Sequence, residues 1–115
     1  MNESDQRLKA EIVALIILKR TEEAIQLLSQ IHKVDTPKLK VGHVKGKKKA
    51  AGVYNHKNKT ILVSKGQNLW EPFIILHEFY HHLRSESGEH RGNEKLADAF
   101  ARDYIIAFNK QKLSI

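Results

Sequence analysis

The sequence contains no cysteine, and it has only two prolines and one methionine among its 115 residues. Because the chain has no thiol, it can form neither a disulfide nor a thiolate metal site. Histidine and carboxylate side chains therefore remain as the plausible metal ligands.

Long apolar segments are also missing. The apolar run at 12–18 is far shorter than the roughly 20 residues that cross a bilayer as a helix, and charged residues flank it on both sides. The N-terminal segment lacks the features of a signal peptide. We therefore expect a cytoplasmic protein without a membrane segment.

Length and composition fit one small domain. A chain of 115 residues is near the commonest domain size, and a hydrophobic content of 41% suffices for one modest core. We expect a single domain over 1–115. It would comprise a helical part at 1–34, a basic sheet at 38–64, two further helices at 71–108 and a tail at 109–115.

Apolar residues in the first 34 positions recur with helical spacing. Ser4 or Asp5 can cap one helix, and Thr21 can cap a second. The predicted apolar faces are Leu8, Ile12, Leu15 and Ile16 in the first segment and Ile25, Leu28 and Ile31 in the second. The pattern leaves open whether these are two helices or one bent helix.

Between Pro37 and Ser64 the pattern changes to short strands. Apolar residues occur at 39–44, 51–54 and 61–63, and the polar run 55–59 separates the last two as a turn. The sequence therefore predicts a small antiparallel sheet between N-terminal and C-terminal helices, which is an α+β fold.

Basic residues are concentrated in this predicted sheet. Positions 38–65 hold nine lysines and no acidic residue, whereas the whole chain has a net charge of +7. Such a segment can bind nucleic acid, attract acidic substrates, or keep the sheet edge from aggregating. The lysines lack interleaved aromatic residues and arginines, and no nucleic-acid-binding motif is present. We therefore favour protection of the edge and do not expect nucleic acid as a partner.

The most informative residues lie in an apolar run at 73–83. There His77, Glu78 and His81 form the pattern H-E-x-x-H. Two histidines four positions apart lie one turn apart on the same face of a helix, so both imidazoles can reach one metal ion. With zinc in such a site, Glu78 would take a proton from an activated water and pass it to the leaving group.

This motif alone does not establish a metal site. Random order would produce it somewhere in a chain of this composition with a probability of about 3%, and the alternative is a surface helix with a solvated histidine-rich face. The context favours an ordered helix, because Pro72 suits a first turn and Arg84 with Gly88 suits an exit.

A third ligand is expected from the next helical segment, because a catalytic zinc usually has three protein ligands and one open position. Glu94 and Asp98 are four residues apart on one face, and the small Ala97 and Ala101 suit close packing. Glu94 would complete the ligand set. Asp98 would accept a hydrogen bond from a ligand histidine and fix its tautomer. Without the preceding motif, the same segment would be taken as an ordinary amphipathic helix.

Two other histidines lie close to the motif. His90, in the loop before Glu94, is an alternative third ligand, although a ligand on a packed helix is better held than one in a glycine-flanked loop. His82 projects about 100° around the helix from His81, so we expect it to pack or to form hydrogen bonds.

With H-E-x-x-H at 77–81 and E-x-x-A-D at 94–98, the sequence resembles the gluzincin metallopeptidases. It is most similar to the minigluzincins, which resemble the catalytic cores of HtpX-type membrane peptidases, and ImmA/IrrE-type peptidases share the motifs. The resemblance covers about 50–108. It implies that His77, His81 and Glu94 are zinc ligands, that Glu78 is the general base and that Asp98 supports a ligand histidine.

The resemblance also implies a mode of substrate binding. In the family, a strand over the cleft pairs with an extended substrate, and Ala50, Ala51 and Gly52 are the matching stretch. Gly52 would let another backbone approach closely, although it could instead mark only a bulge.

Minigluzincins are zymogens held by their C-terminal segments, so the resemblance directs attention to the tail at 109–115. If the last helix ends near Phe108, the tail could just bring the Ile115 carboxylate back to the metal. A helix two residues longer would leave this block to a neighbouring chain in a homodimer. The alternative is a frayed terminus.

We therefore expect a zinc-dependent endopeptidase with one Zn²⁺ per chain and a peptide or protein substrate. No motif marks the residue that would hold the oxyanion, although Tyr54, His56 and Tyr104 carry suitable groups. Three alternatives remain open. They are a regulatory protease that cuts one specific repressor, as in the ImmA/IrrE group, a non-catalytic zinc or nucleic-acid module, and a toxin-like interaction protein that uses the basic sheet.

Overall fold

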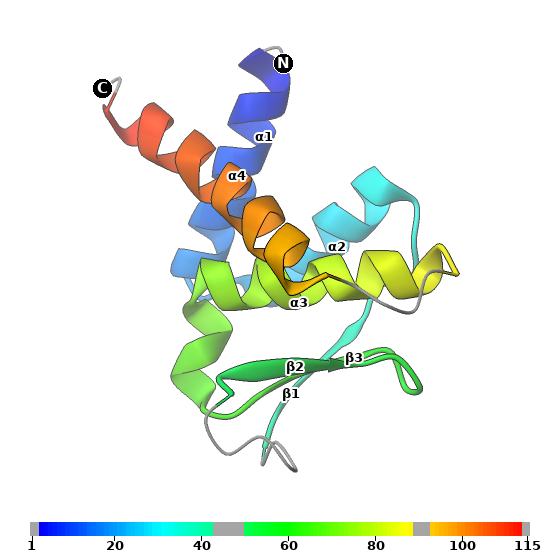
Figure 1. The fold of residues 1–115 in the computed structure, drawn as a ribbon. Helices are drawn as coiled ribbons and strands as arrows, with labels where there is room; N and C mark the ends of the chain where they lie inside the picture. The colour runs from blue at the N-terminus through cyan, green and yellow to red at the C-terminus, as the bar shows by residue number, and fades with distance from the viewer. Residues whose placement is uncertain (1–2, 43–49, 89–92, 114–115) are drawn as a thin grey trace.

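The computed structural model describes residues 3–42, 50–88 and 93–113 (Figure 1). The fold is α+β, as the sequence predicts. Its elements in chain order are α1 (Glu3–Ile17), α2 (Thr21–His32), β1 (Lys38–Val41), β2 (Gly52–Asn55), β3 (Thr60–Val63), the 3₁₀ helix η1 (Gly66–Trp70), α3 (Pro72–Glu86) and α4 (Glu94–Leu113). Among the described helices, none combines the length and the apolar character that a bilayer crossing needs.

The N-terminal segment forms two separate helices joined by a tight turn. α1 ends at Ile17, and Lys19 then takes a positive φ of 66°, so that the chain reverses before α2. Ile31, expected on the apolar face of α2, is 39% exposed. It lies in the last turn, at the border of the buried face that Ala24, Ile25 and Leu28 form.

The predicted caps of these two helices are wrong. Ser4 and Asp5 lie inside α1 rather than before it. Thr21 is already the first residue of α2, and its Oγ1 donates a hydrogen bond to the carbonyl oxygen of Leu69 instead of accepting one from α2. The Thr21 hydroxyl, which local sequence rules predict to cap α2, therefore forms a hydrogen bond to a residue far away in the sequence.

The three strands form a mixed sheet in the order β1-β3-β2. β2 and β3 make an antiparallel hairpin, but β1 runs parallel to β3, so the prediction of an antiparallel sheet is wrong for this pair. The chain reverses after β1 and again after β2, and β3 then inserts between the two earlier strands. Alternation of apolar residues specifies which face of a strand is buried, not which strand lies beside it. Val44, expected in the first strand, lies outside the described residues.

α3 is the central element of the core. Figure 1 shows it lying above the sheet and running roughly along β2, with the N-terminal end of α4 against it. On the sheet side, Ile61 and Val63 of β3 are fully buried, and Ile75, Leu76 and Phe79 of α3 are fully buried as well. The core cluster is completed by Ile12, Val13, Ile16, Ala24, Ile25, Leu28, Ala101 and Tyr104. Because α3 is packed on most of its circumference, the directions of its remaining side chains are fixed.

α4 is longer than predicted, running to Leu113 rather than ending near Phe108. Asn93 caps it, since its Oδ1 accepts hydrogen bonds from the backbone N–H groups of Lys95 and Leu96 at 2.7 and 3.4 Å. Apolar spacing ends at Phe108, but the sequence has no glycine or proline between 94 and 113, so nothing in it stops the helix there.

Candidate metal centre

One face of α3 carries the two histidines of the predicted site. The ring centroids of His77 and His81 lie 5.1 Å apart, and their side chains are only 12% and 16% exposed. Pro72 starts this helix and its other faces are held in the core, so both imidazoles are directed to the same side. Glu78 is buried next to them, with its Oε2 3.9 Å from Nε2 of His77.

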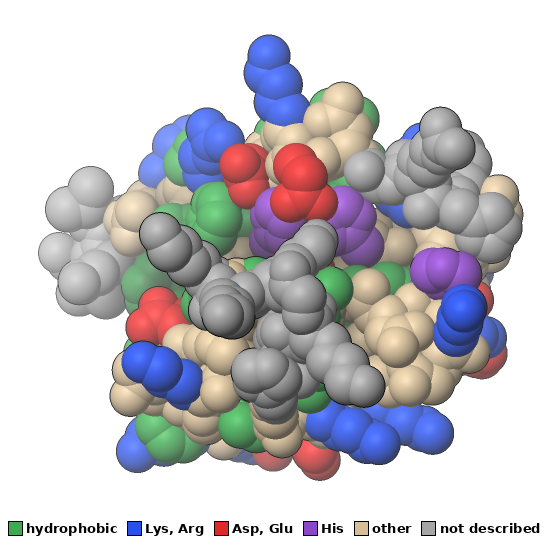
Figure 2. Space-filling view, turned by 60° about the horizontal axis from the view of Figure 1, so that its bottom comes forward, with side chains coloured by type: hydrophobic (Ala, Val, Ile, Leu, Met, Phe, Trp, Pro, Cys, Tyr) green, Lys and Arg blue, Asp and Glu red, His purple; other side chains and the backbone are tan. Residues whose placement is uncertain are grey.

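The beginning of α4 brings two carboxylates to these histidines. Asp98 Oδ1 lies 2.8 Å from Nδ1 of His77, and the two oxygens of Glu94 lie 2.9 Å from Nε2 of His77 and 2.8 Å from Nε2 of His81. Ala97 on the same helix is fully buried, and its small side chain allows α4 to approach α3 closely. Figure 2 shows histidine and acidic side chains gathered at one place on the surface of the molecule. The structure thus brings together four residues that the sequence places on two separate helices.

The two nitrogens of His77 each face a carboxylate. A neutral imidazole has one N–H, so it can donate to only one of these two carboxylates, and its other nitrogen then presents a lone pair to a carboxylate oxygen. Both approaches are favourable only if the ring carries a second proton or if a cation lies between one nitrogen and its carboxylate, and Nε2 is the nitrogen that lies beside His81 and Glu94. His81 Nε2 faces the other oxygen of the same carboxylate, so one cation would satisfy all three groups.

The donor set fits a metal ion. Ligand atoms of His77, Glu78 and His81 all lie within 4.8 Å of one another, so this group could hold a metal. Ligand atoms around a tetrahedral zinc ion lie about 3.4 Å apart, so the Glu94 carboxylate would have to move outward by about half an ångström. Its side chain is 76% exposed, which leaves room for this adjustment.

A cavity of about 240 Å³ opens beside Glu78 and His81, with walls from β2, α3 and α4. Ala50 and Gly52 line it, and Ala51 directly follows Ala50. The pairing of β2 with β3 is regular from Gly52 to Asn55, so Gly52 does not mark a bulge. Instead it permits a close approach, since a Cβ there would lie 3.0 Å from Ile74 Cγ2 and 3.5 Å from Glu78 Cγ.

His82 points away from this site, as the sequence predicts, and is fully buried. Its Nε2 donates a hydrogen bond to the Asp35 carbonyl oxygen at 2.6 Å, and its Nδ1 accepts one from the Tyr54 hydroxyl at 2.7 Å. Burial lowers the pKa of His82 and raises the pKa of Tyr54, so the neutral forms that make these two bonds are favoured. The bond between them ties β2 to α3 at the residue that follows His81. Sequence spacing gives no signal for this contact.

The three residues considered as oxyanion donors occupy two different environments. Tyr54 and His56 line the cavity beside Glu78. Tyr104 lies in the core with only 5% exposure, and burial raises its pKa to about 12. Tyr104 is therefore not a donor at the cavity, and the other two remain candidates.

Because α4 is longer than predicted, the C-terminal tail cannot return to the metal centre of its own chain and block it. Between Glu94 and Leu113 a helix rises about 28 Å, whereas two further residues span at most about 7 Å. Ile115 itself lies outside the described residues, as does His90, the alternative third ligand. By this reach, Ile115 could block only the site of a neighbouring chain.

Comparison of the chain with models of protein families, with curated proteins and with solved structures finds no match. The resemblance to the gluzincins therefore rests on the two sequence motifs. Any functional conclusion rests on those motifs together with the geometry of the site.

Proposed function

We propose that this chain is a zinc-dependent peptidase whose metal is held by His77, His81 and Glu94. One observation carries the proposal. The single carboxylate of Glu94 lies 2.9 and 2.8 Å from the Nε2 atoms of the two histidines, with the buried Glu78 beside them. Two imidazoles and one carboxylate are a donor set typical of catalytic zinc, which keeps a further position for water or substrate.

A zinc ion in this set would lower the pKa of a water molecule to about 7 and would polarise a carbonyl group. The Glu78 carboxylate would accept one proton from the attacking water. It would then give that proton to the amine nitrogen as the C–N bond breaks, so that one water yields one acid and one amine. Asp98 would accept a hydrogen bond from the Nδ1–H of His77, 2.8 Å away, and would thereby leave Nε2 as the nitrogen that binds the metal.

In the part of the chain that the structure describes, no strand pairs with the outer edge of β2, and this edge supports an extended peptide as the substrate. Ser64 N donates to the Ala51 carbonyl oxygen at 2.9 Å, and bonded pairs alternate along an antiparallel ladder. The backbone groups of Val53 and Asn55 therefore face β3, whereas those of Gly52 and Tyr54 face away from it. These two residues also line the cavity beside Glu78, so a strand added at this edge would pass the carboxylate.

The test compares wild type with Glu78→Gln after both have been freed of metal and loaded with one equivalent of zinc. Each protein is incubated with an unstructured protein such as casein, and fragments are counted by mass spectrometry. We expect Glu78→Gln to bind zinc as wild type does and to lose at least about 100-fold in hydrolysis, because it keeps the ligands and lacks the base.

Two results would contradict the proposal in different ways. Equal hydrolysis by the two proteins, including no hydrolysis by either, would leave a zinc-binding module without the proposed chemistry. Failure of wild type to bind zinc would remove the metal site itself.

A further inference from the structure

Among the described residues, the sheet has a second edge that pairs with no further strand, formed by β1 on the side opposite β2, and we call it the free edge of β1. In the parallel ladder, Lys38 N donates to Lys59 O and Gly42 N donates to Val63 O, each at 2.9 Å. Alternate residues of a parallel strand bond to the same neighbour, so Lys38, Lys40 and Gly42 face β3. The backbone N–H and C=O groups of Leu39 and Val41 therefore point away from the sheet.

A groove runs beside this edge. A cavity of about 370 Å³ lies between α2 and residues 36–40, and a second cavity of about 420 Å³ adjoins it. Glu22 and Leu39 line both cavities. Trp70, 38% exposed, lines the second, and the Nζ of Lys19 lies 4.4 Å from the centre of its ring. The groove thus combines a free strand edge with apolar surface from Leu39 and Trp70.

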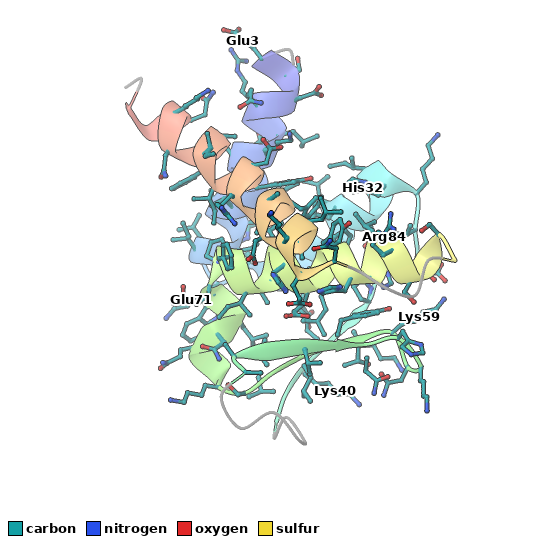
Figure 3. The ribbon with its side chains drawn as sticks, viewed as in Figure 1. Glu3, His32, Lys40, Lys59, Glu71 and Arg84 are labelled. Carbon is teal, nitrogen blue, oxygen red and sulfur yellow. The ribbon has the colours of Figure 1, made fainter. Side chains whose placement is uncertain are left out.

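The charges of β1 select the kind of partner. Lys38 and Lys40 are exposed and share the face opposite Leu39, which packs against the core, and Figure 3 places Lys40 on the side of the sheet away from α3. If the β1 strands of two copies of the chain paired with each other, the lysines of one copy would lie opposite those of the other. Like charges directly opposite destabilise such a pairing. An incoming strand with acidic side chains on that face would instead be matched.

We propose that the free edge of β1 binds an extended acidic segment of a partner protein, which adds to the sheet as a further strand. Its acidic side chains would lie along Lys38 and Lys40, and the alternate apolar side chains would lie towards Leu39 and Trp70. A nucleic acid fits less well, because it has no peptide N–H and C=O groups to pair with the edge of β1. Glu22 and Glu23 line the groove with Leu39 and Trp70, where the incoming strand would present its apolar side chains rather than its acidic ones. This site is distinct from the candidate metal centre and does not depend on hydrolysis.

The probe is a synthetic peptide of alternating glutamate and valine, about six residues long and blocked at both ends, titrated into the full chain. We expect saturable binding and slower hydrogen exchange of the Leu39 and Val41 amides. Val41→Pro removes an N–H that points away from β3, so it spares the sheet and should weaken binding at least about fivefold. If this variant does not fold, exchange in wild type decides the question, and unchanged exchange at both amides overturns the proposal.

Three controls separate strand addition from general attraction: a double variant of matched charge, a lysine-valine peptide and a peptide with methylated backbone nitrogens. Lys38→Glu with Lys40→Glu should weaken binding at least about tenfold, whereas Lys57→Glu with Lys65→Glu, which changes net charge equally, should weaken it less than about threefold. A lysine-valine peptide should not bind. Equal losses in the two double variants, or equal binding of a peptide methylated on its backbone nitrogens, would overturn strand addition. Tighter, Lys38-dependent binding of a single-stranded oligothymidylate than of the peptide would assign the edge to nucleic acid instead.

Discussion

Asp98 Oδ1 lies 2.8 Å from Nδ1 of His77, on the side of the ring opposite Glu94. Both acids project from α4, one turn apart, and together they engage the two nitrogens of one imidazole. With a metal bound at Nε2, the hydrogen bond from Nδ1–H to Asp98 would hold His77 in the tautomer that the metal needs.

Asp98→Asn should weaken zinc binding by roughly 10 to 100-fold, because an amide accepts the Nδ1–H bond without the negative charge that strengthens it. Competition with a chromophoric chelator gives the affinity, and thermal unfolding checks that the domain is intact. Asp103→Asn is the matched control, since Asp103 lies on the same helix and pairs with Lys9 away from the site. Equal zinc affinity for Asp98→Asn and wild type would reduce Asp98 to a surface acid.

Gly52→Ala should lower the free energy of unfolding by about 1 to 3 kcal/mol, because the new methyl group would press on Ile74 and on the carbonyl oxygen of Leu62. Urea unfolding measures the change. In Gly66→Ala the added Cβ meets no atom within 4 Å, so that variant should change stability by less than about 1 kcal/mol. Similar stabilities for the two variants would show that β2 can move away from α3 without cost.

The sequence predicts those parts of this site that depend on residues close together in the chain. The spacing of His77 and His81, and of Glu94 and Asp98, gives two helix faces, and the small Ala97 indicates that the helices can come close. The distances between those faces depend on packing that no local pattern encodes.

Other features escaped prediction because they are made by residues far apart in the chain. Tyr54 meets His82 across 28 positions, and Thr21 meets Leu69 across 48. The parallel pairing of β1 and the close approach at Gly52 are of the same kind. The end of α4 is not predicted correctly for a different reason, since the apolar spacing stops at Phe108 and the helix continues to Leu113.

Tyr54→Phe should destabilise the fold by about 1 to 3 kcal/mol, because it removes the hydroxyl that donates to Nδ1 of the buried His82. Tyr80→Phe makes the same change on α3, where the described residues show ring contacts with His81 and Phe100 but no hydrogen bond to the hydroxyl. It should cost less than about 0.5 kcal/mol. If urea unfolding shows the same loss of free energy of unfolding in both variants, the hydrogen bond from Tyr54 to His82 makes no net contribution to stability.

The buried Tyr104 predicts a stability change at alkaline pH. Its folded pKa of about 12 lies above the unfolded value of 10.0, so its stabilising contribution is complete below about pH 10 and is lost as pH rises towards 12. Between pH 9 and 11.5, wild type should lose about 2 kcal/mol more stability than Tyr104→Phe, which cannot ionise. The comparison removes the effect of the titrating lysines, which both proteins share. A constant difference between the two proteins across this range would contradict the assignment.

If His77, His81 and Glu94 hold one catalytic metal, a crystal structure of the zinc-loaded chain will show the ion between them. Anomalous difference maps recorded on both sides of the zinc absorption edge locate the ion without assumptions about its ligands. We predict one peak per chain at about 2.0 to 2.2 Å from Nε2 of both histidines and from an oxygen of Glu94. A peak bound by His90 in place of Glu94 would transfer the third ligand to the loop. A peak that touches neither His77 nor His81 would mean that this histidine pair does not hold the metal.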